Sequence, residues 1–321
     1  MNFLPRFARW LGVGFIGLLT SPALADPFSF AVVGDLPYGS SEKTLSDYRA
    51  LIDEINRQDP ALVIHVGDTK SGGTLCTDAT LAERLDLLNA FEAPTLYTPG
   101  DNEWTDCHRL IAGGYDPVER LDHIRRTYFA DPGQSLGQNR IAVAHQGDAG
   151  YPENSRVMIG DVMFITAHVV GSNNGFEAVR PQAAAEFAAR DAANREWLKD
   201  SFWEAEDAKA VVVAIHGNMF EFDFAPYWDA EGFLRQSGFR LFANALIVEA
   251  GLFGKPILLV YGDSHKYRMT HPFPNKAPNI MALETFGDKL MHAVQVHVRP
   301  DSGYPFAVQP LLNPVRPLRR K

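Results

Sequence analysis

Cysteine, low-complexity sequence and long apolar runs are all scarce in this 321-residue chain. The apolar stretch from Trp10 to Thr20 is too short for a comfortable transmembrane helix, and no later segment is apolar enough to span a bilayer. The charged fraction of 21% is ordinary for a globular protein. With 46% hydrophobic residues, the chain has ample material for the core of one large domain or two smaller ones.

Basic residues are also in deficit. The chain carries 30 lysines and arginines against 39 aspartates and glutamates, so its net charge is −9. A general nucleic-acid-binding protein needs a basic footprint, so we expect no such activity. A small anionic substrate is not excluded, because bound cations would dominate the field at their own site.

The first 25 residues have the pattern of a secretory signal peptide. Arg6 and Arg9 form a positively charged start, an apolar run follows, and Ala23-Leu-Ala25 offers a cleavage site before Asp26. An uncleaved N-terminal anchor would need a longer apolar run. We therefore expect export to the periplasm or the medium, with cleavage near Ala25. The mature chain would have a net charge of −11 and no transmembrane helix.

The two cysteines, Cys76 and Cys107, both lie in polar loop sequence. In an oxidising compartment an isolated pair is typical of a disulfide. The alternative is two ligands of a structural metal, although no CxxC motif accompanies them. A bridge would either brace neighbouring loops around a site or simply staple them together.

The first hundred residues alternate between apolar strands and amphipathic helices, which is typical of βαβ units with buried parallel strands. We expect strands at 28–33, 61–66 and 95–98, and helices at 41–58 and 81–91.

The later part of the chain mixes long helices with further strands. We expect helices at 115–129, 181–203 and 231–252, antiparallel strands within 140–170, buried strands at 210–215 and 256–261, and a closing pair of strands at 280–285 and 292–298. These segments predict a single domain over 26–310, and the Pro- and Arg-rich segment 311–321 is expected to be a loose basic tail.

Five of the expected strands end in polar side chains that carry oxygen or imidazole groups. They are Asp35, Asp68, Asp101 with Asn102, His216, and Asp263 with His265. Ligands of open α/β sheets sit beyond the carboxyl ends of strands, so these side chains should converge on one rim. Crowded carboxylates repel one another, and divalent cations remove that penalty. Carboxylate, amide and imidazole ligands together suit Mn, Fe, Zn or Mg. Gly-Asp after a strand is also an ordinary turn, but its recurrence at successive strand ends favours a metal site.

The order of these motifs resembles that of the calcineurin-like metallophosphoesterases, which include purple acid phosphatases. The family order is D-x-H, GD, GNH[DE], a lone His after a strand, and GHxH. The corresponding segments here are Gly34-Asp-Leu-Pro-Tyr38, Gly67-Asp68, Gly100-Asp-Asn-Glu103, His216-Gly217 and Gly262-Asp-Ser-His265. The resemblance covers residues 28 to about 300. It implies an α/β fold (α+β in some schemes), a two-sheet αββα sandwich with the site at one edge.

The resemblance also implies an activity and a ligand set. The activity is hydrolysis of a phosphomonoester or phosphodiester by water activated between two divalent metal ions, so the chain would be a phosphatase or a phosphodiesterase. Carried over position by position, one metal would be held by Asp35, Asp68 and His265, with Asp68 bridging, and the second by Asp101, His216 and Asp263. The partner would be a small phosphoester such as a nucleotide or an aryl phosphate.

This chain departs from the family pattern at several positions. Pro37 replaces the His of D-x-H, and the neighbouring Tyr38 is a candidate substitute. Asp101 replaces the metal-binding Asn, and Asp263 replaces the first His of GHxH. These changes make the ligand set richer in oxygen, which favours Mg, Mn or Ca over Zn.

Asn102 stands where the family has its catalytic His, the usual proton donor to the leaving group. General acid catalysis contributes about 10²–10⁴-fold to a rate. His108 could supply the proton if its loop folds back, and a one-residue slip would make Asn102 a metal ligand instead. The alternative to an enzyme is a catalytically weak or inactive relative that binds a metal or a ligand.

Aromatic residues are concentrated just after His216, between Phe220 and Trp228. Such a loop beside a phosphate site could stack a nucleobase or an aryl leaving group. Equally, it could be a lid that packs onto its own core.

Overall fold

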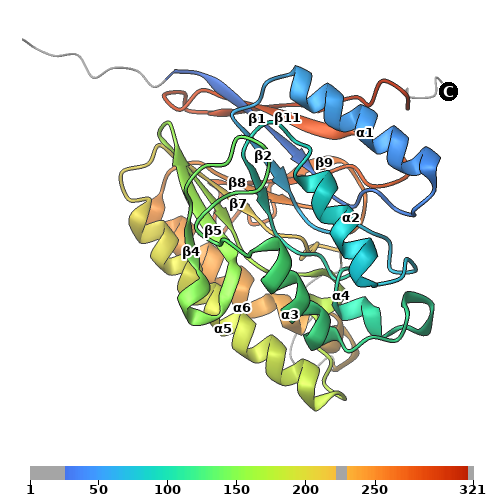
Figure 1. Cartoon of the computed structure of the whole chain (residues 1–321). Coiled ribbons are helices and arrows are strands. Elements are labelled where there is room, and N and C mark those ends of the chain that lie inside the picture. Colours follow the sequence, from blue (N-terminus) through green and yellow to red (C-terminus); the bar gives the residue numbers. More distant parts are fainter. Residues whose placement is uncertain (1–25, 222–229, 317–321) are drawn as a thin grey trace, which may run out of the picture.

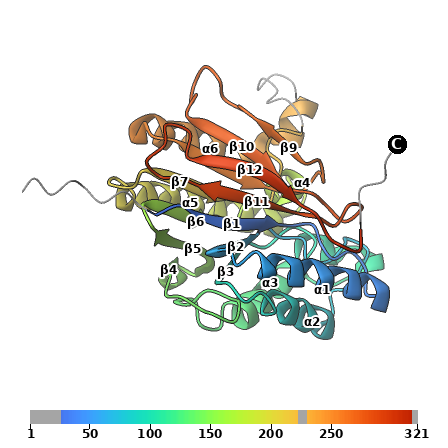
Figure 2. The same ribbon diagram turned by 90° about the horizontal axis from the view of Figure 1, so that it is seen from above.

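Two β-sheets stacked face to face form the centre of the protein, and helices cover the outer face of each (Figure 1). The structure is a computed structural model that describes residues 26–221 and 230–316. Figure 2 shows the same layers from above, with α1, α2 and α3 on the opposite side from α6. This is the αββα sandwich that the family resemblance implied.

The first sheet has five strands in the order β12-β11-β1-β2-β3, and its central strands alternate with helices along the chain. Strands β1, β2 and β3 run parallel, while β11 pairs antiparallel with β1 and with β12. The strands are β1 (Phe28–Val33), β2 (Leu62–His65), β3 (Thr95–Tyr97), β11 (Ala293–Val298) and β12 (Phe306–Leu311). The helices on its outer face are α1 (Glu42–Arg57), α2 (Asp78–Leu88) and α3 (Pro117–Tyr128).

The second sheet has seven strands in the order β4-β5-β6-β7-β8-β10-β9. Its four inner strands β6, β7, β8 and β10 run parallel, and β4, β5 and β9 add antiparallel edges. The strands are β4 (Ala144–Gln146), β5 (Tyr151–Ile159), β6 (Val162–Thr166), β7 (Ala210–Ala214), β8 (Ile257–Tyr261), β9 (Arg268–Thr270) and β10 (Ile280–Glu284). Long helices α5 (Pro181–Glu204) and α6 (Ala230–Phe253) pack on its outer face.

Short helical turns occupy the loops at the carboxyl ends of the strands and beside them. They are η1 (Thr105–His108), η2 (Leu110–Ala112), η3 (Gly147–Ala149) and α4 (Gly171–Asn174). None of the helices in the described part of the chain has both the length and the apolarity that crossing a membrane requires. The predicted signal peptide over 1–25 lies outside the described residues.

Alternation along the strands divides the core into three layers. In β1, Phe30 and Val32 face the second sheet, whereas Ala31 and Val33 face the helices of the first layer. Each of these four side chains is almost completely buried. A strand buried on both faces has no polar side to alternate with, which explains why these segments appear as continuous apolar runs in the sequence.

A buried ion pair joins the first helical layer to the second sheet. Glu153 of β5 accepts hydrogen bonds from Arg125 of α3 and from His168, which follows β6. Burial alone would raise the pKa of Glu153. The hydrogen bonds and charges of His168 and Arg125 outweigh this effect and lower the pKa to about 2. Glu153 is therefore ionised in the folded protein, and breaking this contact should be costly.

The expectation that 280–285 and 292–298 form a closing pair is wrong. Strand β10 pairs with β8 in the second sheet, whereas β11 pairs with β1 in the first. Both segments are apolar, so their pattern does not reveal which sheet they join. The edge strands β9 and β12 were not anticipated either.

The expected loose tail is also wrong for its first six residues. Leu311 pairs with Ala293 in β12, and buried Asn313 donates from Nδ2 to the Asp47 carbonyl at 2.8 Å. Arg316 Nε then lies 2.7 Å from Asp47 Oδ2. The sequence of the tail does not reveal these contacts, because Asp47, the partner of Arg316, lies 269 residues earlier. Residues 317–321 lie outside the described part.

Candidate metal centre

The loops that follow β1, β2, β3, β7 and β8 bring the candidate residues to one edge of the sandwich. Asp35 N donates to Gly67 O at 3.0 Å, so the first two loops are joined through their backbones. Asp263 N donates to Asp35 Oδ1 at 3.0 Å, which joins loops from the two different sheets. These crossing bonds explain how residues more than 200 positions apart meet.

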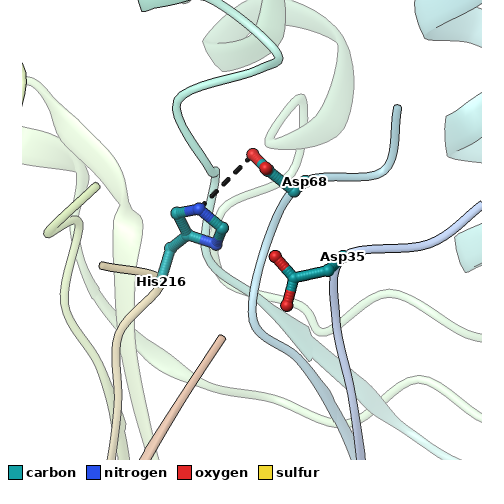
Figure 3. A group of neighbouring side chains, drawn as sticks. All are labelled: Asp35, Asp68 and His216. Atoms are coloured by element: carbon teal, nitrogen blue, oxygen red, sulfur yellow. Dashed lines mark ion pairs between the residues drawn. The ribbon is translucent and has the colours of Figure 1, made fainter. Parts of the chain in front are cut away.

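The gathered side chains form two groups whose ligand atoms lie within 4.8 Å of one another. One group is Asp35, Asp68 and His216 (Figure 3), and the other is Asp101, His216 and Asp263. In Figure 3 the two carboxylates and the imidazole ring point toward a shared space. The groups share His216, whereas the resemblance implied Asp68 as the common residue.

His216 is fully buried and held in a single orientation. Its Nδ1 lies 2.7 Å from the carbonyl oxygen of Val66, which can only accept a hydrogen bond, so Nδ1 carries a proton. Its Nε2 faces Asp101 Oδ1 at 3.1 Å and Asp68 Oδ1 at 3.4 Å. A backbone carbonyl that fixes one ring nitrogen and leaves the other for a cation is the usual arrangement of a metal-binding histidine.

Asp68 is held by donors from two loops. The Tyr38 hydroxyl donates to Asp68 Oδ2 at 2.7 Å, Asn102 N donates to Oδ1 at 3.0 Å, and the Asn102 side-chain amide also contacts Oδ2. The same hydroxyl accepts from Asn102 Nδ2 at 3.0 Å and lies 3.2 Å from His265 Nε2. The structure thus places Tyr38, the candidate substitute for the missing motif histidine, in contact with the candidate ligands.

His265 and the remaining carboxylates complete the edge of the site. His265 Nε2 lies 3.5 Å from Asp35 Oδ1. Asp263 Oδ2 accepts from Asn218 N at 2.9 Å, and Asp101 Oδ2 accepts from the Ser172 hydroxyl at 2.7 Å. Each carboxylate therefore has a hydrogen-bond donor or an imidazole beside it that fixes its direction.

Sequence reasoning missed Ser172, Asn218 and Lys70. Ser172 and Asn218 lie in loops outside the five motifs, and only their contacts with Asp101 and Asp263 mark them. Lys70 comes two residues after Asp68 and is fully buried, with its Nζ 3.1 Å from Ser71 O. The position of Lys70, two residues after Asp68 at a strand end, was the one sequence feature that could have drawn attention to it.

Several of these residues adopt a backbone conformation that L-amino acids seldom adopt. The φ angles are 58° at Asp35, 54° at Asp68, 77° at Asp263, 62° at His265 and 52° at Ser172. Non-glycine residues with positive φ are uncommon, and such conformations cost about 1–3 kcal/mol each and cluster at functional sites. Because these conformations are concentrated at the candidate ligand positions, they indicate a functional site and not a set of ordinary turns.

Glycine is required where the loops approach the carboxylates most closely. A Cβ at Gly171 would lie 2.9 Å from both Asp101 Oδ1 and Asp263 Oδ1, and one at Gly262 would lie 2.3 Å from Asp35 Oδ2. These glycines therefore leave room for the carboxylates to converge.

The electrostatics show how much the site favours added positive charge. Burial and the neighbouring acids raise the pKa of Asp68 well above its usual range, and burial together with Asp101 raises that of Asp263 to about 7. Burial opposes a charge on Asp101 and on His216 alike. Their mutual contact nevertheless lowers the pKa of Asp101 to about 2, and Asp68 and Asp101 raise that of His216 well above its usual value. Protons on such groups are what a bound divalent cation would displace.

His108 does not join the cluster. Its Nδ1 lies 2.6 Å from Thr105 O within the same turn, and within the described part of the chain it makes no hydrogen bond or ion pair with the candidate ligands. Asn102, in contrast, contacts Asp68 directly. Of the two residues proposed for catalysis, only Asn102 lies among the candidate ligands.

Cys76 and Cys107 form a disulfide, as predicted. Both sulfur atoms lie 3.7–3.8 Å from the carbonyl oxygen of Asn102. The bridge therefore packs against the backbone of a residue that positions Asp68. This contact favours bracing of the site over a remote staple. Most of the aromatic loop, residues 222–228, lies outside the described residues.

Comparison with known proteins agrees with this geometry. The sequence profile of the calcineurin-like phosphoesterase family matches residues 28–267, and no match was found among curated proteins. Among solved structures, a dimetal phosphatase from Danio rerio is similar at 10% identity with a TM-score of 0.55, covering 90% of this chain and all of that one. A purple acid phosphatase from yellow lupin is similar at 12% identity with a TM-score of 0.51, covering 89% of this chain and 54% of that one.

At such low identity the two structures establish the fold, and the family match establishes the class of enzyme. The resemblance noted in the motifs is confirmed, and so is the assignment as a phosphatase or phosphodiesterase. The chain is a member of the calcineurin-like phosphoesterase family, a metal-dependent phosphoesterase.

Proposed function

We propose that the protein is an exported hydrolase of small phosphoesters that works with two divalent cations. The ligands would be Asp35, Asp68, Asp101, His216, Asp263 and His265, with Asn102 at the edge of the set. The observation that carries the proposal is the buried His216, whose Nε2 faces two carboxylates from different loops. Bound cations would activate water and neutralise phosphoryl charge.

The donor set fits such cations. The cluster offers carboxylate oxygens and imidazole nitrogens, and its buried acids carry raised pKa values that a cation would relieve. Mn, Mg, Fe and Zn all accept this mixture, and the surplus of oxygen ligands favours Mn or Mg. Asn102 and Tyr38 serve as positioning residues, because both hold Asp68.

The amide of Asn102 has a consequence for the choice of substrate. An amide donates hydrogen bonds but does not give up a proton, so it cannot protonate a departing alkoxide. Hydrolysis of alkyl esters would lose the ~10²–10⁴-fold benefit of a general acid. Aryl esters need that benefit less, because their leaving groups depart as stable phenolates. We therefore propose aryl phosphates, and other phosphoesters with acidic leaving groups, as the preferred substrates over nucleoside monophosphates, whose nucleosides would have to leave as alkoxides.

The same observation favours a second candidate, a weak or inactive relative that binds a metal or a ligand. Turnover of 4-nitrophenyl phosphate with added Mn separates the two. We expect metal-dependent turnover in the wild type and in Asp53→Ala, a change on the exposed face of α1. We expect loss of more than about 100-fold in Asp68→Ala and His265→Ala. Folded protein that binds Mn and shows no turnover at any pH would establish the binding protein instead.

Export is a separate part of the proposal. It is supported by the leader-like sequence over 1–25 and by the disulfide between Cys76 and Cys107, since disulfides persist in oxidising compartments. Mass spectrometry of the protein recovered from a bacterial periplasm should show a chain that begins at Asp26. Recovery of the full-length chain from the cytoplasm alone would contradict export.

A further inference from the structure

A cavity of about 530 Å³ lies between α6, β9 and the segment that follows β9. Its volume is in the range of small-molecule sites. The lining includes the cations Arg240, Arg268 and Lys276 and the aromatic rings of Phe220, Tyr261 and Phe273. None of the described residues that line it is acidic, although the chain as a whole carries a net charge of −9. The cavity lining thus combines cationic side chains with aromatic rings.

The Asn218 side chain and backbone connect this cavity to the metal centre. Asn218 N donates to Asp263 Oδ2 at 2.9 Å, and its Oδ1 accepts from Phe220 N at 2.9 Å. Phe220, a wall of the cavity, is only four residues from His216, so their Cα atoms lie within about 14 Å. One short segment therefore supplies both a candidate ligand and a cavity wall.

Glu284 makes a second connection. Its Oε1 accepts from the Ser264 hydroxyl at 2.5 Å, and its Oε2 accepts from Arg268 Nε at 2.8 Å. Ser264 lies between the candidate ligands Asp263 and His265. Arg268 is about a third exposed (37%), whereas Glu284 is fully buried. The buried glutamate thus fixes one cation of the cavity relative to the metal centre.

Helix α6 makes the third connection. Gly238 O accepts from Asn174 Nδ2 at 3.0 Å, and Asn174 belongs to α4, whose Ser172 holds Asp101. Arg240, two residues further along α6, lines the cavity. Phe220, Arg268 and Arg240 of the lining therefore each belong to a segment that is hydrogen-bonded, directly or through one residue, to a loop that carries a candidate ligand.

We propose that this cavity binds the leaving group of the phosphoester, and that the leaving group is an aromatic ring with a negative charge of its own. The inference rests on the proposed function and adds the class of leaving group to it. Hydrolysis joins a water oxygen to phosphorus and breaks the phosphorus–aryl oxygen bond. The aryl oxygen departs as a phenolate, and the two protons of the water stay with the phosphate or pass to solvent.

Two features of the cavity select this chemistry. Phe220 meets Tyr261 and Phe273 edge to face, with ring centroids 5.6 and 5.5 Å apart, so part of the cavity wall is aromatic and suits an aromatic ligand. Arg268 and Lys276 would pair with an anionic substituent on that ring, since cations bound to carboxylates make strong hydrogen bonds. An aryl leaving group also suits a site in which Asn102 replaces a proton donor.

The test compares 4-carboxyphenyl phosphate with its neutral counterpart 4-carbamoylphenyl phosphate, both with Mn. The readout is the ratio of their kcat/KM values, because effects common to both esters cancel. We expect Lys276→Gln to lower the preference for the carboxylate about three- to tenfold, and Arg268→Lys to lower it as well because the fork of donors is lost. Lys199→Gln, an exposed change on α5, serves as the matched control and should leave the ratio unchanged. A ratio that stays within about twofold of wild type in both cavity variants overturns the inference.

If neither ester is turned over, that result refutes the proposed function but leaves the inference about the cavity open. Calorimetric binding of 4-hydroxybenzoate then tests the cavity directly. We expect this phenol to bind more tightly than 4-hydroxybenzamide, and Lys276→Gln to weaken its binding about three- to tenfold. Equal affinity for the acid and the amide, or affinity that Lys276→Gln leaves unchanged, overturns the inference whatever the activity.

Discussion

Replacing Tyr38 by phenylalanine removes one hydroxyl from the centre of the site and leaves the ring in place. That hydroxyl donates to Asp68 Oδ2 at 2.7 Å, accepts from Asn102 Nδ2 at 3.0 Å and lies 3.2 Å from His265 Nε2. The ring itself packs edge-on against His265, with centroids 5.2 Å apart, and phenylalanine would keep this contact. The change therefore isolates the effect of the hydroxyl on the direction of the candidate ligands.

The size of the effect follows from the charge on its partner. A hydrogen bond to a charged group contributes about 1.5–3 kcal/mol, and each 1.4 kcal/mol corresponds to a factor of ten. Loss of an outer-shell partner of a metal ligand typically costs 10–100-fold in metal affinity or activity. We expect the Tyr38→Phe enzyme to lose about 10–100-fold in kcat/KM and to need more Mn for half-maximal activity.

The assay is turnover of 4-nitrophenyl phosphate over a titration of Mn. Tyr267→Phe is the matched control. The ring of Tyr267 stacks on that of Phe286, with centroids 4.4 Å apart, and its hydroxyl makes no hydrogen bond to the described residues. This control should behave as wild type. If Tyr38→Phe keeps both kcat/KM and the Mn requirement within about twofold of wild type, the hydroxyl does not position Asp68 and the reasoning is refuted.

Three further changes test other parts of the structure. Ser172→Ala removes the donor to Asp101 Oδ2, and we expect the Mn requirement to rise about tenfold with little change in thermal stability; an unchanged requirement would contradict this. Replacing Cys76 and Cys107 by serine opens a 31-residue span, and urea unfolding should show a loss of about 3–4 kcal/mol, with Mn-dependent activity also reduced if the bridge braces the site. Glu153→Gln should cost about 3 kcal/mol at pH 7, since the pKa of Glu153 is lowered to about 2 in the folded state. A carboxyl group whose pKa is lower in the folded state stabilises the fold at pH values above its unfolded-state pKa. The difference in unfolding free energy between wild type and Glu153→Gln should therefore shrink as pH falls from about 5 to 2; a cost independent of pH would contradict the ion pair.

The sequence predicted the convergence of the candidate ligands where local rules apply. Asp35, Asp68 and Asp101 each follow a short apolar strand and a glycine, and parallel strands carry such residues to a common edge. His216 and His265 were found in the same way after later strands. These predictions needed only the periodicity of each segment and the rule for strand ends, which are properties of neighbouring residues.

What the sequence could not show depends on contacts between distant segments. Strands β10 and β11 are both apolar, and only their hydrogen-bonded partners reveal that they belong to different sheets. Ser172 is marked by a contact with Asp101, 71 residues earlier, and no motif announces it. The choice of His216 as the residue common to both ligand groups likewise requires the distances themselves.

The most direct test of the account is the metal content of the purified mature protein, measured by elemental analysis after incubation with Mn, Mg, Fe and Zn and removal of unbound ions. We expect about two divalent ions per chain in the wild type, and a clear loss in variants with alanine at Asp68 or His216. Folded wild-type protein that retains no divalent metal from any of these solutions would contradict the central claim that this cluster is a metal centre.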